Sequence, residues 1–317
     1  MNKYLILFLT LFFLSCGQNN KEEVAINAMS IDVKVTRFDK IFFETPPEQL
    51  GKVKQEFPFF FPEGNDDAVW IEKMQNPQWQ ELYAEVQKKF ANVETLKSDF
   101  EALFKHISYY YPKTKVPKVI TVISEMDYDN KVIYADSLVI VSLEMYLGKD
   151  HRFYQFPNYI KQNFEPNQIM PDVVSSFFKT VAPPNLDKKL LSSMVYAGKE
   201  LYMKDLFLPN VAANEKIGYT PDQLIWCEEN ESYIWRYFID KQLLYSDDQK
   251  LIPRFINPAP FSKFYLEIDN ESPGKVGAYI GWQIVNSYMQ NNKVSLQQLL
   301  QTNAQDIFEK SKYKPKK

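Results

Sequence analysis

The sequence predicts an α+β fold: a mostly helical domain with a small β-sheet in its N-terminal half. Short runs rich in β-branched residues lie within residues 118–148, whereas most segments after residue 168 have apolar residues at intervals of three or four. The chain contains 9 Gly but 20 Tyr and 24 Phe, a balance that disfavours a glycine-rich cofactor-binding fold and favours helices packed through aromatic rings. Strands in one half and helices in the other are typical of an α+β domain.

The first half of the chain contains the predicted sheet and one long helical region. Ile31, Val33 and Val35 alternate with polar residues, which predicts a first strand. The aromatic segment FPFFFPEG predicts a loop that leads into a short helix, and a helical pattern then continues until Pro112 ends it. Three further strands are expected at residues 118–124, 131–137 and 138–148.

The second half of the chain is expected to be helical. Helices are predicted at residues 168–181, 187–205, 221–245, 274–291 and 295–311. Thr220 followed by Pro221 is a typical cap and first turn for the third of these. The pattern has no internal repeat, so residues 31–311 are expected to form a single domain, followed by a basic tail at 312–317.

The N-terminus has the pattern of an export signal. Lys3 precedes a nearly uninterrupted apolar run at residues 4–14, which is shorter than the roughly 20 residues that a membrane-spanning helix needs. The run ends in Leu14, Ser15 and Cys16, and this ending resembles a bacterial lipobox, in which the cysteine is acylated and becomes the first mature residue. The alternative is a plain secretory signal in which the cysteine occurs by chance.

The resemblance to a lipobox implies a division of the N-terminal region and a location. Residues 1–15 are then a lipoprotein signal peptide, Cys16 is the lipidation site, and the polar residues 16–30 form a flexible tether. Acyl chains on Cys16 would anchor the protein to a lipid membrane, because each buried methylene contributes about 0.8 kcal/mol. We expect a location in the cell envelope outside the cytoplasm, with the inner and outer membranes both left open.

The helices at 168–181 and 187–205 raise the question of a metalloenzyme, since a predicted strand pair precedes them. Zinc proteases of the His-Glu-x-x-His type place two histidines on one helix turn and take a third ligand from a following helix. The chain has only two histidines, His106 and His151, and neither lies on these helices. The positions where a metal site would be expected hold other side chains: Ser176, Phe177, Thr180 and Ala197. We therefore predict no metal, no cofactor and no catalytic residue.

Other chemistries receive weaker support from the sequence. Asp172 and Glu200 could bind a cation, but a carboxylate at a helix start ordinarily interacts with the helix dipole. Cys227 could be a nucleophile, although a buried structural thiol is the favoured interpretation. The net charge of −3, with both signs scattered, provides no basic surface for nucleic acid. Aromatic loops such as HRFYQFPNY could form a binding patch or simply cover the core.

Several long motifs resemble one family. The lipobox together with VTRFDKIFF, RFINPAPFS, SPGKVGAYIGWQIVNSYM and GYTPDQLIWCEENESYIWRYFIDKQLLYS is similar to the gliding-motility lipoprotein GldB family of Bacteroidetes, from Cys16 to about residue 311. The resemblance implies a zincin-like fold, similar to that of predicted zinc-dependent proteases but without the zinc ligands. Of the family's functional positions, only Cys16 transfers to this chain.

The resemblance also implies a function. It indicates a non-catalytic, lipid-anchored envelope protein required for gliding motility and linked to type IX secretion, with other envelope or gliding-machinery proteins as partners. Two alternatives stay open. The protein could use a degenerate protease cleft to bind a peptide or glycan, or it could be an active hydrolase with an unrecognised site.

Overall fold

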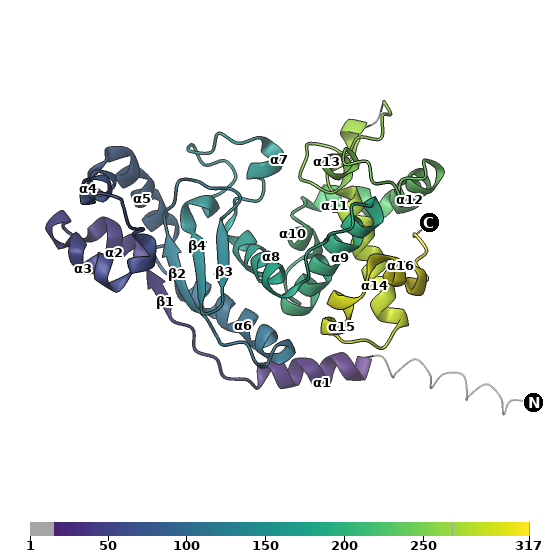
Figure 1. Cartoon of the computed structure of the whole chain (residues 1–317), viewed down its shortest axis with the longest axis horizontal. Helices are drawn as coiled ribbons and strands as arrows, with labels where there is room; N and C mark the ends of the chain where they lie inside the picture. The colour runs from purple at the N-terminus through teal and green to yellow at the C-terminus, as the bar shows by residue number, and fades with distance from the viewer. Residues whose placement is uncertain (1–15, 268, 317) are drawn as a thin grey trace, which may run out of the picture.

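The computed structural model describes residues 16–267 and 269–316, and Figure 1 shows the arrangement of the elements. The predicted signal peptide lies outside the described residues. The α+β prediction is confirmed: a four-stranded sheet built from the first half of the chain is surrounded and extended by helices. Figure 1 shows α2–α5 gathered on the β1 side of the sheet, with α8, α9 and α14 on the β3 side.

The sheet is mixed and has the strand order β1-β2-β4-β3. It comprises β1 (Val35–Arg37), β2 (Lys118–Val122), β3 (Val132–Ala135) and β4 (Leu138–Ser142). Strands β1, β2 and β4 are parallel, whereas β3 pairs with β4 in the antiparallel sense and lies at the edge. The first strand begins later than predicted because the paired register starts at Val35, opposite Val119, although Val33 is also buried.

The helices of the N-terminal half surround the sheet, with α2–α5 on its β1 side and α6 beside α1 and α8. They are α2 (Phe38–Glu44), α3 (Leu50–Glu56), α4 (Asp67–Gln75), α5 (Pro77–Lys89) and α6 (Glu94–Tyr110). The aromatic segment after α3 divides between core and surface: Phe57 and Phe61 are buried, whereas Phe59 is exposed. The ring of Phe38 packs edge-on against the rings of Phe57 and Phe61, and these contacts help to bury all three side chains.

The segment expected to be a tether is instead mostly helical. Helix α1 (Cys16–Asn27) lies beside α6 (Figure 1). Ile26 is buried, and the hydroxyl of Tyr110 donates to the carboxylate of Glu22 at 3.4 Å. The segment contains no proline to break a helix, and the contacts with α6 supply the stability that its polar sequence lacks. A helix therefore stands at residues 16–27, where a flexible tether was expected.

The second half consists of helices joined by loops. They are α7 (Asn158–Lys161), α8 (Ile169–Val181), α9 (Leu190–Phe207), α10 (Ala213–Ile217), α11 (Pro221–Glu229), α12 (Glu231–Asp240), α13 (Leu251–Phe255), α14 (Val276–Asn291), α15 (Leu296–Gln301) and α16 (Ala304–Ser311). Three of the five predicted helices are single helices close to the expected bounds. Thr220 caps α11 through a capping box with Gln223, as its sequence predicted.

Two predicted helices are each divided in two by an asparagine. Asn230 separates α11 from α12, and its side-chain amide donates to the carbonyl oxygen of Trp226 at 2.9 Å. Asn303 separates α15 from α16 and accepts a hydrogen bond from the backbone N–H of Asp306 at 2.9 Å. These side chains satisfy backbone groups at helix ends, and this allows the chain to turn where the apolar periodicity alone predicts continuation.

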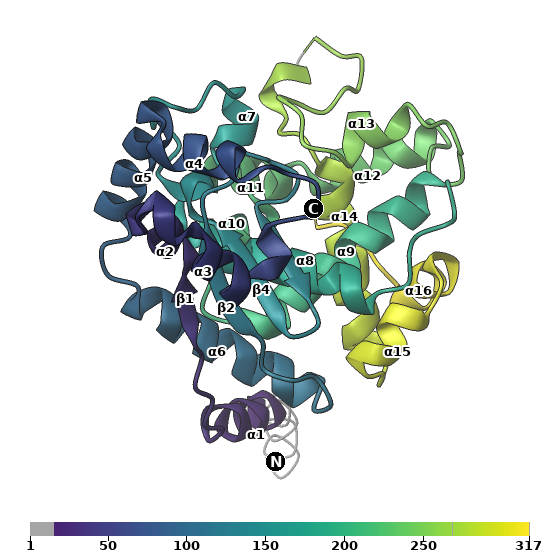
Figure 2. The ribbon, with the colours of Figure 1, turned by 60° about the vertical axis from the view of Figure 1, so that its left-hand side comes forward.

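Helices α9 and α14 form the centre of the second half. Figures 1 and 2 both show α14 beside α9, and their contact is the most extensive between any two described helices. Helix α8 lies between α9 and the edge strand β3. This order places the first turn of α8, the middle of α9 and the start of α14 close to one another.

Candidate functional site

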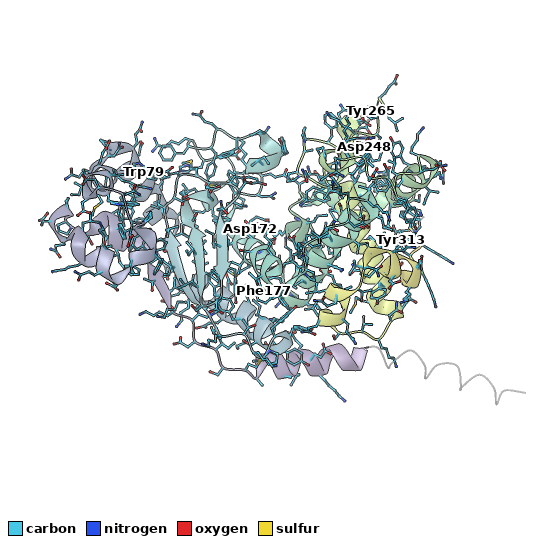
Figure 3. The ribbon with its side chains drawn as sticks, viewed as in Figure 1. Trp79, Asp172, Phe177, Asp248, Tyr265 and Tyr313 are labelled. Carbon is cyan, nitrogen blue, oxygen red and sulfur yellow. The ribbon has the colours of Figure 1, made fainter. Side chains whose placement is uncertain are left out.

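A polar cavity of about 150 Å³ lies where the first turn of α8, the middle of α9 and the start of α14 meet. Figure 3 shows Asp172 of α8 near the centre of the molecule, with Phe177 farther along the helix toward α6. One wall comes from the region of α7 and the opposite wall from the loop that follows α13. The charged residues that line the cavity are Lys131, Asp172, Glu200, Lys204, Lys216 and Lys275.

Asp172 is held at the first turn of α8 by two partners from the sheet side. The ammonium of Lys131, just before β3, lies 2.7 Å from Oδ2 of Asp172. The hydroxyl of Tyr146 donates to the same oxygen at 2.8 Å. The Lys131 ammonium also lies over the ring of Tyr146, at 5.5 Å from its centre. The three side chains form one compact, charge-balanced group.

Glu200 occupies the corresponding position on α9. Its Oε1 lies 3.0 Å from the ammonium of Lys204, one helical turn later, and accepts from the hydroxyl of Ser175 on α8 at 2.7 Å. Burial raises the pKa of Glu200, but Lys204 and Ser175, with a smaller contribution from Lys275, outweigh it and hold the pKa below its ordinary value. Glu200 is therefore an ionised carboxylate at neutral pH, and its two partners both bind Oε1.

Lys204 and Lys216 connect α9 to α10. Lys204 donates to the backbone carbonyl oxygen of Lys216 at 3.1 Å, and Lys216 pairs with Asp205 at 3.0 Å. Asp205 also accepts from the indole N–H of Trp282 on α14 at 2.7 Å. Burial raises the pKa of Asp205, and Lys216 only partly opposes this. The network ties α9, α10 and α14 together around the cavity.

Lys275 differs from the other three lysines. Its ammonium donates to the carbonyl oxygen of Ile217 at 2.5 Å, and no carboxylate of the described residues lies within ion-pair distance of it. Burial, followed by the charge of Lys204, lowers the pKa of Lys275 to about 8, although Glu200 and Asp172 oppose this. Its backbone is left-handed, with φ of 64°, immediately before α14. That conformation costs a non-glycine residue on the order of 1 kcal/mol.

A second cavity, of about 320 Å³, adjoins the first. Glu200, Lys204 and Lys275 line both cavities, so the charged cluster stands between them. The second cavity is more apolar, because Ile252, Ile256 and other carbon-rich side chains form much of its wall. The polar first cavity and the less polar second cavity thus lie on either side of Glu200, Lys204 and Lys275.

The four positions proposed from the sequence do not gather at this site. Ser176 accepts a hydrogen bond from the backbone N–H of Tyr134 at 2.8 Å and so joins α8 to strand β3. Phe177 is buried in the core, and the hydroxyl of Thr180, an exposed residue, bonds within its own helix. Ala197 borders the second cavity.

The polar side chains that α8 and α9 contribute to the cavity are Asp172, Ser175, Glu200 and Lys204. The sequence offers Asp172 and Glu200 as carboxylates for a cation, but it does not show that Lys131 pairs with Asp172. The spacing of Glu200 and Lys204 is an i,i+4 pair that the sequence does reveal. Lys131, Lys216 and Lys275 come from distant segments, and no local signal connects them.

The histidines and the cysteine lie outside the cavity lining. His106 is buried on α6 with Nδ1 2.9 Å from the carbonyl oxygen of Ala102, and His151 lies 3.4 Å from Glu85. Cys227 is fully buried, and burial raises the pKa of its thiol to about 12. Across residues 16–267 and 269–316, no three His, Cys, Asp or Glu side chains gather as a metal would require.

Comparison with known proteins assigns the family. The family model of the gliding motility protein GldB matches residues 19–315. The chain belongs to this family. Membership makes it a gliding-motility-related lipoprotein, and hence a membrane-anchored protein of the cell envelope. No curated protein and no solved structure matches the chain. In the described part of the chain, no helix has the length and apolar character needed to cross a bilayer.

Proposed function

We propose that this GldB-family protein is a non-catalytic component of the gliding apparatus, anchored by lipid on Cys16, that holds other envelope proteins and supports type IX secretion. Family membership supports the link to gliding. The lipobox-like ending of the N-terminal apolar run supports Cys16 as the anchor, since Leu14 and Ser15 precede it. The connection to secretion rests on the resemblance of the motifs to the family.

The observation that carries the non-catalytic part of the proposal is the pairing of both cavity carboxylates. Asp172 and Glu200 each have a lysine ammonium within 3.0 Å. A general base works best with a pKa near the operating pH, whereas the pKa of Glu200 is lowered. A divalent cation would have to displace Lys131 or Lys204 to reach Oδ2 of Asp172 or Oε1 of Glu200. Both features favour a structural or binding role for the cavity.

The same arrangement supports descent from a zincin-like fold. Strands β3 and β4 precede α8, α9 follows it, and the cavity lies between these two helices. Zinc analysis of the purified protein and a peptidase screen test the non-catalytic role. Stoichiometric zinc, or turnover that is lost on Glu200→Gln, would instead favour an active hydrolase.

The anchoring and gliding roles are tested together in a deletion strain of a gliding host. Wild-type protein should restore surface spreading and secretion, whereas Cys16→Ser should leave the protein out of the membrane fraction and restore neither. Cys227→Ala is the matched control, because it removes the other cysteine of the chain without touching the lipobox. Membrane association that persists in the Cys16→Ser variant would contradict the anchor. Normal spreading and secretion after deletion would contradict the role in gliding.

A second candidate function is a binding module. The two adjoining cavities, with charged and less polar ends, favour it. Such a protein would recognise a peptide or glycan end while anchored in the envelope. This candidate is compatible with a role in gliding, because a scaffold protein can also carry a ligand site.

A further inference from the structure

The surroundings of Lys275 disfavour its positive charge. The residue is left-handed and immediately precedes α14, whose N-terminal end carries the positive pole of the helix dipole. Lys204 lies close enough to disfavour the charge further. A residue chosen for stability at this position would be glycine or a small polar residue. Such local conflicts concentrate at functional sites, where a ligand relieves them.

The charges around the cavity do not cancel. Lys131, Lys204 and Lys216 are each paired with a carboxylate, respectively Asp172, Glu200 and Asp205. Lys275 has a backbone carbonyl as its one hydrogen-bond partner in the described part of the chain. Four ammonium groups against three carboxylates leave one positive charge in excess. The cavity therefore suits a ligand group with a single negative charge.

The neutral lining adds hydrogen-bond donors. Tyr128, Tyr159, Asn163 and Gln168 line the cavity, and their side chains make no hydrogen bond to other described residues. Two phenol hydroxyls and two carboxamide groups are thus available beside Lys275. A carboxylate accepts hydrogen bonds at two oxygens and matches this set of donors.

We propose that the cavity at Lys275 binds a carboxylate group carried by a chain end or a small acid, with the ammonium of Lys275 paired to that carboxylate. A phosphate monoester is a poorer match, because it carries between 1.5 and 2 negative charges and Asp172 and Glu200 line the same space. The cavity volume of about 150 Å³ suits a carboxylate with a few attached atoms. The inference does not depend on a role in gliding.

Replacing Lys275 by glycine should change the stability of the protein and its binding of the ligand in opposite directions. Lys275→Gly removes the ammonium and supplies a residue that adopts a positive φ without strain. This variant should unfold at a higher temperature than the wild type and yet lose the ligand. Lys275→Arg keeps the charge and should retain part of the binding. Lys179→Gln, an exposed lysine change on α8, is the control and should alter neither property.

The experiment is calorimetric titration of the purified, acylated full chain in detergent. The probes are a short peptide with a free C-terminal carboxylate, the same peptide amidated, glucuronate, and inorganic phosphate. The free-carboxylate peptide or glucuronate should bind, and Lys275→Gly should weaken that binding by about 10- to 100-fold, the range expected for one charged hydrogen bond. Binding of the free but not the amidated peptide identifies a peptide end, and binding of glucuronate alone identifies a sugar acid.

Three results would overturn the carboxylate site. These are no binding of either carboxylate probe at millimolar concentration, tighter binding of phosphate than of both, and full binding by the folded Lys275→Gly variant. None of them bears on Cys16, so the gliding proposal would stand if Cys16→Ser still abolished spreading. Conversely, a failure of the Cys16 experiment would leave the carboxylate site untouched.

Discussion

Gly198 of α9 and Gly281 of α14 bring the two helices into backbone contact. A Cβ atom on Gly198 would lie 2.2 Å from the carbonyl oxygen of Gly281, and one on Gly281 would lie 1.8 Å from the carbonyl oxygen of Met194. No side chain fits in either place. This close approach is what brings Lys275, six residues before Gly281, to the same cavities as Glu200 and Lys204.

Gly281→Ala is expected to destabilise the protein strongly. The added methyl group meets backbone atoms, which cannot rotate away, so α9 and α14 must separate. We expect a loss of about 3 kcal/mol or more in the free energy of unfolding, measured by chemical denaturation. Gly51→Ala on α3 is the control, because nothing lies within 4 Å of the new methyl group. It should be neutral or slightly stabilising, and equal effects of the two changes would refute the packing argument.

Glu144 should make stability depend on pH. The side chain is fully buried, and burial raises its pKa to about 7, although the Ser124 hydroxyl and nearby backbone groups oppose this. The ordinary value is 4.5, so the folded state binds the proton more tightly and stability falls as pH rises from about 4.5 to 7. The full cost above pH 7 is roughly 3 kcal/mol.

The Glu144→Gln variant tests this dependence by denaturation at a series of pH values. The variant should have a higher free energy of unfolding than the wild type at pH 8. The two proteins should differ little at pH 4.5, because the Glu144 side chain of the folded wild type is protonated at that pH. Glu125→Gln, on an exposed carboxylate, is the control and should leave the dependence as it is. A constant difference between wild type and Glu144→Gln across the series would contradict the assignment.

Ser176 should matter for the attachment of α8 to the sheet. Its hydroxyl accepts from the backbone N–H of Tyr134, a buried residue on the edge strand β3. Ser176→Ala leaves that N–H without its acceptor and should cost about 1 to 2 kcal/mol in the free energy of unfolding. Thr180→Ala is the control, because the Thr180 hydroxyl donates within its own helix, to the carbonyl oxygen of Phe177. It should lower the free energy of unfolding by less than Ser176→Ala does. Hydrogen exchange at Tyr134 should rise in the first variant and not in the second.

Carboxylate binding at Lys275 should weaken at alkaline pH. The ligand pairs with the ammonium form, whose pKa is lowered to about 8 in the free protein. Asp172 and Glu200 favour the charged form, whereas Lys131 and Lys204 disfavour it. Affinity should be level below about pH 7 and fall by about tenfold per unit well above 8. Titration from pH 6 to 10 measures this, and an affinity that is the same at both ends would count against Lys275 as the partner.

Much of the fold could be predicted from local patterns. The helices around residues 168–181, 187–205 and 274–291 and the strands near 118–142 follow from apolar periodicity and β-branched runs, which report burial along one face. The failures have local causes too. Asn230 and Asn303 each end a helix through side-chain hydrogen bonds inside a continuous apolar pattern, and α1 forms because α6 lies beside it.

The candidate site was predictable only in part. Asp172 and Glu200 could be named from the sequence, but the metal positions chosen beside them, Ser176 and Phe177, turned out to face the sheet and the core. The register of a helix face cannot be fixed by periodicity to better than about one turn. One turn is enough to exchange a cavity residue for a core residue.

The sequence by itself determined the family and the mostly helical α+β class, and it contains the lipobox-like ending at Cys16, because each depends on residues that are neighbours along the chain. Only the tertiary structure decided which charges meet. Lys131, Glu200, Lys216 and Lys275 come from four separate segments that share one cavity. Glu200 and Lys275 meet there because two glycines allow α9 and α14 to touch. An ion pair or an unpaired ammonium depends on distances of a few ångströms between such segments, and those distances are set by packing across the whole core.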